Sequence, residues 1–278
     1  MTRPQGHGRR LTYYDFGQTT VFAARLDQRF SYCCYVPADY DEDGAKRYRL
    51  AVIVHGTERG MQYYRDAFID FAETNGCIVL APLFPVGITA PGELSSYKLL
   101  RHGDLHYDAV LLSMVDELAE KYRLADGRFL LYGFSGGGHF THRFLYLHPE
   151  RLLAASIGAP GVVTLLDRGH DFWVGVRDWP QRFGKAIDLD AVRQVPVQML
   201  IGGADTETWE ITITPGDDWW MPGADLAGAN RQHRMQALKA SFERHGIAVR
   251  HDVVPGIGHD DREMLGQVKE FFAKVLAR

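Results

Sequence analysis

Short apolar segments rich in β-branched residues alternate with segments of helical spacing, and this alternation constrains the fold of the chain more than any other feature. Residues 50–54 (LAVIV) and 77–81 (CIVLA) fit strands that are buried on both faces. Residues 105–122 carry apolar side chains at helical spacing. Strands that alternate with helices predict an α/β fold, with a mostly parallel central sheet and helices on both faces. The predicted strands are 30–36, 50–54, 77–81, 128–132, 152–157, 197–201 and 249–254, and the predicted helices are 63–75, 105–122, 139–147, 231–245 and 263–276.

The length and the charge of the chain limit what it can be. Its 278 residues fit one domain, so we expect residues 1–278 to form a single unit. The formal net charge of −4 argues against nucleic acid as the main partner. Residues 1–10 lack the apolar stretch of a signal peptide, and no segment is long and apolar enough to cross a bilayer.

The cysteine content bears on the compartment. The chain has three cysteines, Cys33, Cys34 and Cys77, which are too few for a disulfide framework. We therefore expect a reduced, cytoplasmic protein with no membrane partner. The oligomeric state stays open.

Two segments interrupt the alternation of strands and helices, and both follow predicted strands. They are residues 161–195 and 206–228, and they hold all five tryptophans of the chain. In parallel α/β sheets the ligand site lies beyond the carboxyl ends of the strands. We therefore expect these two insertions to form a small cap over the site.

The sequence Gly133-Phe134-Ser135-Gly136-Gly137 matches the pattern GxSxG. A predicted strand precedes it and a predicted helix follows, which is the context of a nucleophile elbow. A sharp turn there lifts the serine hydroxyl above the sheet, and glycines on either side avoid collisions with neighbouring backbone. The start of the following helix directs free amide groups at developing negative charge. Ser135 is therefore the candidate nucleophile.

Residues 133–139 (GFSGGGH) resemble the elbow of the α/β-hydrolases, and especially that of esterases of the polyhydroxyalkanoate-depolymerase and feruloyl-esterase type. Residues 52–160 are similar to these esterases as well, with one strand ending in His55-Gly56 and the next ending in Pro82. The resemblance implies an α/β-hydrolase fold and a serine hydrolase that cleaves a carboxylic ester through an acyl-enzyme. It names no substrate.

A serine hydroxyl needs a base to accept its proton. The order serine, acid, histidine in α/β-hydrolases points to His259, which follows the last predicted strand and precedes the closing helix. The acid should follow the penultimate strand, where Asp205 stands; Glu207 is the near alternative. A buried carboxylate there would orient the imidazole and stabilise its cation. The predicted triad is Ser135, His259 and Asp205.

The oxyanion hole and the substrate contacts are assigned by position. The backbone amide of Gly136, which follows the nucleophile, is one expected oxyanion donor. The other comes from the loop after the strand that ends in His55-Gly56, where Thr57 is preferred and Glu58 is the alternative. Glu58 either binds substrate or pairs with Arg59, and the pairing of adjacent exposed charges is the commoner outcome. His55 in such families supports the oxyanion loop. The residues expected to contact substrate are Glu58, His55, Phe134, Trp173, Trp209 and Trp219.

Other classes of function have weaker support. His139 and His142 are three residues apart, but they belong to no HExxH pattern, so we expect neither a metal nor a cofactor. The expected partner is a small-molecule or short oligomeric ester. A peptidase or amidase, or a polyester or polyamide depolymerase with the same triad, is the alternative within enzymes. A non-catalytic binding module is the alternative outside them, although all three triad candidates are present.

Overall fold

The computed structural model describes residues 11–278. Residues 1–10, on which the expectation about a signal peptide rests, lie outside the described residues. The strands are β1 (Gly17–Gln18), β2 (Phe22–Ala23), β3 (Ser31–Val36), β4 (Tyr48–Val54), β5 (Cys77–Leu83), β6 (Arg101–His102), β7 (Leu105–His106), β8 (Leu124–Phe134), β9 (Leu152–Gly158), β10 (Val197–Gly202) and β11 (Val249–Val254). The α-helices are α1 (Met61–Ala67), α2 (Ile69–Asn75), α3 (Tyr107–Lys121), α4 (Gly136–Leu147), α5 (Trp179–Phe183), α6 (Leu189–Gln194), α7 (Arg231–Arg244) and α8 (Leu265–Leu276), with short 3-10 turns at Tyr13–Asp15, Ser96–Leu99 and Pro149–Arg151.

Within residues 11–278 a nine-stranded sheet runs in the order β1-β3-β5-β4-β8-β9-β10-β11, and β2 pairs with β3. All neighbouring strands from β5 to β11 are parallel, whereas β3 is antiparallel to β5. The predicted mostly parallel sheet is therefore confirmed, with an antiparallel edge added. Because parallel strands end on the same side, the loops after β4, β8, β9, β10 and β11 meet at one edge.

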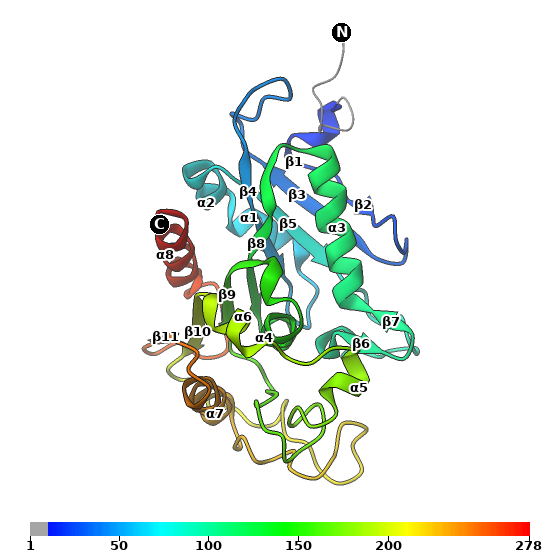
Figure 1. The fold of residues 1–278 in the computed structure, drawn as a ribbon, viewed down its shortest axis with the longest axis vertical. Coiled ribbons are helices and arrows are strands. Elements are labelled where there is room, and N and C mark those ends of the chain that lie inside the picture. The colour runs from blue at the N-terminus through cyan, green and yellow to red at the C-terminus, as the bar shows by residue number, and fades with distance from the viewer. Residues whose placement is uncertain (1–10) are drawn as a thin grey trace.

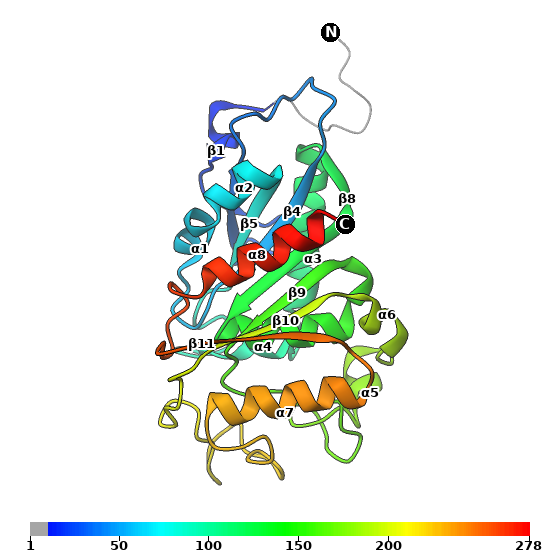
Figure 2. The ribbon, with the colours of Figure 1, turned by 90° about the vertical axis from the view of Figure 1, so that its left-hand side faces the viewer.

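Helices cover both faces of the sheet, as the sequence predicts. Helices α1, α2 and α8 lie together in front of the sheet in Figure 2. The ring of Phe71 in α2 packs against that of Phe272 in α8. Helices α3 and α4 cover the opposite face (Figure 1), and α7 packs beside α4 through the rings of Phe242 and Tyr146. The central strands are apolar on both sides because each is buried between these two layers.

One predicted helix is divided in the structure. Residues 63–75 are expected to form a single helix, but α1 ends at Ala67 and α2 begins at Ile69. Phe68 at the break is fully buried and its ring lies against those of Phe71 and Tyr132. The break therefore coincides with a packing position, which the spacing of apolar residues alone does not reveal.

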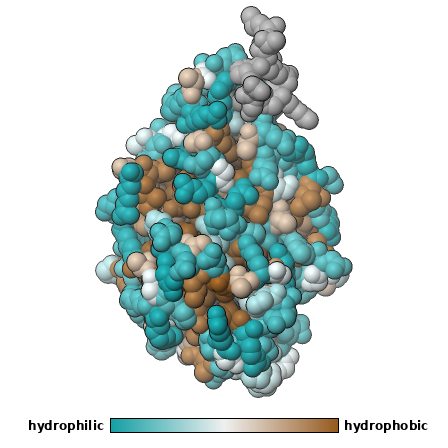
Figure 3. Space-filling view, viewed as in Figure 1, coloured by the Kyte–Doolittle hydropathy of each residue, from teal (hydrophilic) through white to brown (hydrophobic). Residues whose placement is uncertain are grey.

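The two insertions gather beyond the carboxyl ends of the strands. Figure 1 shows the long loops before α5 and between β10 and α7 at the lower end of the molecule, next to α4 and α7. The surface on this side is mostly hydrophilic, with separate apolar patches among polar side chains (Figure 3). No helix within residues 11–278 has both the length and the apolar character that a membrane span requires.

Candidate active site

Ser135 stands between β8 and α4 with a φ of 54° and a ψ of −115°. Few residues other than glycine adopt such angles, and holding one there costs about 1–3 kcal/mol. The neighbouring glycines allow the turn, because a Cβ at Gly133 would overlap the carbonyl of Gly137, and a Cβ at Gly137 would overlap the carbonyl of Val54. The Ser135 N–H donates to the carbonyl of Gly158 at 2.9 Å, which ties the turn to β9. These features form a sharp strand-to-helix elbow.

Asp205 and His259 come from the loops after β10 and β11 and are hydrogen-bonded. His259 Nδ1 lies 2.7 Å from Asp205 Oδ2. Asp205 is only 1% exposed, so its carboxylate is shielded from water. A carboxylate can only accept a hydrogen bond, and the proton of a neutral His259 is therefore on Nδ1. The other ring nitrogen, Nε2, is left free to act as an acceptor.

Ser135 and His259 line the same cavity, which we call the His259 cavity. It has a volume of about 560 Å³. Phe134 also lines it, and its ring stacks on the imidazole of His259 with centroids 4.6 Å apart. Ser135 Oγ makes no hydrogen bond to any of residues 11–278. Hydrogen bonds between catalytic groups are often formed only once substrate is bound.

Arg231 is a member of the site that the sequence analysis does not identify. Its Nη1 lies 3.3 Å from Asp205 Oδ1, so the carboxylate is held between Arg231 and His259. Its Nη2 donates to Glu210 Oε2 at 2.5 Å. Arg231 is the first residue of α7, where the helix dipole disfavours a cation. An arginine at that position is a signal that could have indicated a carboxylate partner.

The loop that carries His259 is attached to α1. Asp261 is buried, and its Oδ1 accepts from the hydroxyl of Tyr63 at 3.4 Å. Burial raises the pKa of the Asp261 carboxyl. Both residues also line the His259 cavity. The carboxylate next to His259 in sequence therefore fixes the loop, while Asp205 contacts the imidazole.

The loop after β4 carries the predicted oxyanion donor Thr57. Arg59 holds this loop by donating to the carbonyls of Thr57 at 2.6 Å, Leu94 at 2.6 Å and Phe84 at 3.1 Å. The expected pairing of Glu58 with Arg59 is therefore not formed, because the guanidinium bonds to backbone instead. Glu58 is exposed and lines the His259 cavity.

His55 lies beneath the same loop and away from the substrate side. It is fully buried, accepts from the N–H of Phe84 at Nε2 (2.9 Å) and donates from Nδ1 to the carbonyl of Gly56 (2.7 Å). Burial lowers the pKa of His55 to about 3, so the ring is neutral. It lines neither cavity at Ser135, so the geometry fits a support for the loop rather than a substrate contact.

The tryptophans of the insertions divide into two groups. Trp209 is 79% exposed and lines the His259 cavity, whereas Trp219 lines a second cavity at Ser135. Trp173 is buried, lines neither cavity and donates from Nε1 to the carbonyl of Trp219 at 2.9 Å. The expected substrate contact of Trp173 is therefore replaced by a structural one. Trp179 is also buried.

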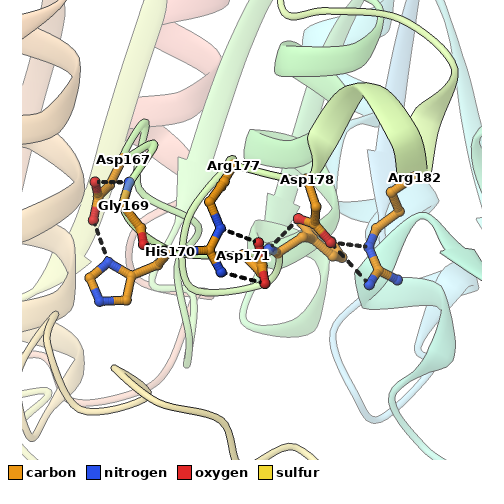
Figure 4. A network of polar contacts seen from close by, with 8 residues as sticks. Asp167, Gly169, His170, Asp171, Arg177, Asp178 and Arg182 are labelled. Atoms are coloured by element: carbon orange, nitrogen blue, oxygen red, sulfur yellow. Dashed lines mark hydrogen bonds and ion pairs between the residues drawn. The ribbon is translucent and has the colours of Figure 1, made fainter.

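The first insertion, residues 161–195, is stabilised by its own polar contacts, shown in Figure 4. Asp171 accepts two hydrogen bonds of 2.7 Å from Arg177, and Asp167 lies 2.6 Å from His170. Asp178 accepts from the N–H of Phe172 at 2.7 Å. These contacts fix an irregular segment that follows neither helical nor strand periodicity.

The second cavity, which we call the Lys98 cavity, has a volume of about 350 Å³. It is lined by Lys98, Thr57, Ser135, His139, Glu210 and Trp219, among others. Thr57, Ser135 and Glu210 line both cavities, so the two meet at the candidate nucleophile. Within residues 11–278, no group of three or more potential metal ligands is placed to hold an ion.

Comparisons with known proteins bear on the fold. No family model and no curated protein matches the sequence. The chain is similar in structure to a poly(aspartic acid) hydrolase from Sphingomonas sp. KT-1, with a TM-score of 0.72 and 23% identity over 92% of this chain and 98% of that one. A poly(3-hydroxybutyrate) depolymerase from Bordetella parapertussis gives a TM-score of 0.71 and 22% identity, over 92% of this chain and 90% of its own.

An S-formylglutathione hydrolase from Agrobacterium tumefaciens is also similar, with a TM-score of 0.62 and 14% identity over 95% of this chain and 96% of that one. At these identities the likeness concerns the fold. The parallel sheet, the helices on both faces and the strand-to-helix turn at Ser135 are common features of such proteins. This chain therefore has the α/β-hydrolase fold.

Proposed function

We propose that this protein is a serine hydrolase that cleaves a carboxylic ester through an acyl-enzyme. The observation that carries the proposal is the arrangement of three groups. Ser135 occupies a strained elbow, and it shares a cavity with His259, whose imidazole is oriented by the buried Asp205. Such a constellation is recognised by its geometry and not by the order of residues alone.

The roles of the three groups follow from this geometry. His259 Nε2 accepts the proton of Ser135 as Oγ bonds to the carbonyl carbon of the ester. Asp205 holds the ring and stabilises the imidazolium that forms. His259 then gives the proton to the departing alcohol as the C–O bond breaks, which leaves the acyl group on Ser135. His259 then takes a proton from a water molecule that attacks the acyl-enzyme. This step releases the carboxylic acid and regenerates the Ser135 hydroxyl.

The negative charge of the tetrahedral intermediate needs donors. The N–H groups in the first turn of a helix have no acceptor within that helix, and Gly136 is the first residue of α4. We assign its amide, together with that of Thr57 in the loop held by Arg59, to the oxyanion hole. Removing one such donor typically lowers kcat by about 100- to 1000-fold.

An ester is the favoured substrate class because an alcohol leaves more readily than an amine. The structural neighbours include a poly(3-hydroxybutyrate) depolymerase and an S-formylglutathione hydrolase. Those names support hydrolysis of esters or thioesters by this fold. The name of a third neighbour, a hydrolase of poly(aspartic acid), makes amides the alternative to test.

The test is active-site labelling combined with a substrate panel. A fluorophosphonate probe should label the wild-type protein and Ser113→Ala, a control in α3 that lines neither cavity, but not Ser135→Ala. Short alkyl esters should be hydrolysed faster than matched anilides. Labelling of a folded Ser135→Ala variant would overturn the assignment of the nucleophile, and preferential cleavage of the anilides would replace the esterase by an amidase. An unreactive wild-type protein would favour a binding module.

A further inference from the structure

Lys98 differs from the other charged groups of its cavity. Its ammonium donates to the hydroxyl of Ser95 at 3.2 Å, and no carboxylate of residues 11–278 lies within ion-pair distance of it. Arg231, the other cation of the cavity wall, is already bound to Asp205 and Glu210. The cavity therefore contains one ammonium group that forms no ion pair within residues 11–278, although Glu210 and Glu93 attract it at longer range.

The carboxylates of this cavity are engaged elsewhere or lie at its mouth. Glu210 bonds to Arg231. Asp217 accepts from the N–H of Thr214 at 2.6 Å and from its hydroxyl at 2.9 Å. Asp217 and Asp218 are both exposed to solvent, where their charges are screened. Lys98, in contrast, is only partly exposed.

The end of the Lys98 side chain lies against the elbow. A Cβ placed on Gly136 would be 2.9 Å from Lys98 Cε and 3.1 Å from Thr57 Oγ1. Lys98 is thus next to the residue after the nucleophile. An anionic group bound by this ammonium would be held close to the carbonyl that Ser135 attacks.

The position of His259 indicates which part of a substrate occupies each cavity. In the proposed mechanism His259 protonates the leaving alcohol, so the alcohol belongs in the His259 cavity. The acyl group, which stays bonded to Ser135, then extends into the Lys98 cavity. The two cavities meet at Ser135, as this division requires.

We propose that Lys98 determines substrate specificity by binding a carboxylate on the acyl part of the ester, so that the preferred substrates are monoesters of short dicarboxylic acids. The inference rests on the proposed function and names its substrate class. Ammonium and carboxylate form a charge-assisted hydrogen bond, which is stronger than a neutral one and stronger still when partly shielded from water.

Lys98 is protonated near neutral pH. Burial and the neighbouring Arg59 lower the pKa of Lys98 to about 8. Two of the charged and titratable groups that face it, Arg59 and Glu93, lie on its own side of the site. Arg143 and His139 face it from α4, and Arg231 from α7. Glu210, Asp217 and Asp218 face it from the second insertion, residues 206–228. The ammonium form is thus available at pH 7 and is lost as the pH rises through about 8.

The experiment compares esters of equal acyl carbon number. Monoethyl succinate is measured against ethyl butyrate, and monoethyl glutarate against ethyl valerate, by pH-stat titration at pH 7. Lys98→Gln should lower kcat/KM for the monoesters by about 10- to 100-fold, as expected for loss of a charged hydrogen bond, and for the neutral esters by less than about threefold. Lys98→Arg should restore part of the difference, and Lys185→Gln, an exposed lysine in the first insertion, serves as control.

The pH dependence gives a second readout that needs no variant. In the wild-type protein the ratio of kcat/KM for monoester and neutral ester should fall between pH 7 and pH 9, as Lys98 loses its proton. Equal losses for both ester types in Lys98→Gln, or a ratio that does not change with pH, would overturn the inference and leave the esterase intact. Failure of the wild-type protein to cleave any of the four esters would count against the proposed function itself.

Discussion

Ser135 is the residue at which catalytic geometry opposes stability. The mirror image of its φ of 54° and ψ of −115° is an extended conformation, so glycine adopts these angles without strain. We expect Ser135→Gly to be more stable than Ser135→Ala by about 1 kcal/mol, because relief of strain exceeds the entropy that glycine loses on folding. Both variants should be inactive. Urea unfolding checks this, and an alanine variant at least as stable as the glycine variant would contradict the strained elbow.

Arg231 can be separated from its neighbour Arg234 by mutation. Arg231 contacts Asp205, whereas Arg234 is equally buried but donates to the carbonyls of Gly228 and Ile211 at 2.9 Å. Arg231→Met leaves the buried Asp205 with one partner fewer, so its hold on His259 should loosen. We expect kcat to fall at least tenfold with little change in KM, whereas Arg234→Met should lower the melting temperature and change kcat by less than about threefold.

Steady-state kinetics and thermal unfolding of the two variants check this expectation. Arg231→Lys keeps the charge and should recover part of kcat. Equal effects of the two methionine variants on kcat would mean that Arg231 acts only through stability. Breaking the buried ion pair of Arg231 costs about 3–5 kcal/mol, and Arg234→Met removes buried hydrogen bonds, so both variants need to be assayed well below their melting temperatures.

Individual residues show how far the sequence predicts the site. Ser135, Asp205 and His259 each follow a strand that can be identified from its apolar residues, and the structure brings Asp205 and His259 into contact. The roles of Arg231 and Lys98 are not predicted from the sequence, because they depend on partners that are distant along the chain. Arg231 meets a carboxylate 26 positions earlier in the chain, and Lys98 lies against Gly136, the first residue of α4. No local spacing encodes such contacts.

Among the elements, the regular ones are predictable and the insertions are not. Strands β4, β5, β9 and β10 lie where runs of apolar residues indicate them, whereas β11 is half polar and none of its residues is fully buried. The antiparallel direction of β3 is not encoded in its own sequence, because a buried strand reads the same in either direction. The insertions have no period, and their conformations depend on specific contacts such as Asp171 with Arg177.

The tryptophans of the insertions should separate into substrate contacts and structural anchors. Trp179 is 1% exposed and its ring lies 4.0 Å from that of Phe183, so Trp179→Ala should cost about 3–5 kcal/mol of unfolding free energy. Trp209→Ala should change stability by less than about 0.5 kcal/mol, because this side chain is exposed. It should instead change kcat/KM differently for small and bulky alcohols.

Urea unfolding and an alcohol series measured on both variants check this separation. A large loss of stability in Trp209→Ala, with all alcohols affected alike, would show that this residue too is an anchor. The expected cap would then contribute Glu210, and no aromatic contact, to the side of the His259 cavity.

At the scale of the whole molecule, the site is the place where the ends of parallel strands bring distant segments together. Thr57 follows β4, Ser135 follows β8, Asp205 follows β10 and His259 follows β11. The second insertion closes the edge with Glu210, which lines both cavities. Two cavities of different volume therefore open on either side of one serine.

This division predicts an asymmetry in substrate size. The His259 cavity, at about 560 Å³, should accept the alcohol, and the Lys98 cavity, at about 350 Å³, should accept the acyl group. Replacing phenyl acetate by 2-naphthyl acetate enlarges the alcohol part of the ester. We expect kcat/KM, divided by the rate constant for hydroxide hydrolysis of the same ester, to change by less than about threefold. Lengthening the acyl chain from phenyl acetate to phenyl octanoate should lower it by tenfold or more, because a long alkyl chain would displace water from Lys98, Glu210 and Asp217, the charged groups that line this cavity. The opposite order, with long acyl chains accepted and naphthyl acetate rejected, would reverse the assignment of the two cavities. Lys98 would then lie on the alcohol side of Ser135, and the charge that it recognises would have to be sought on the leaving group.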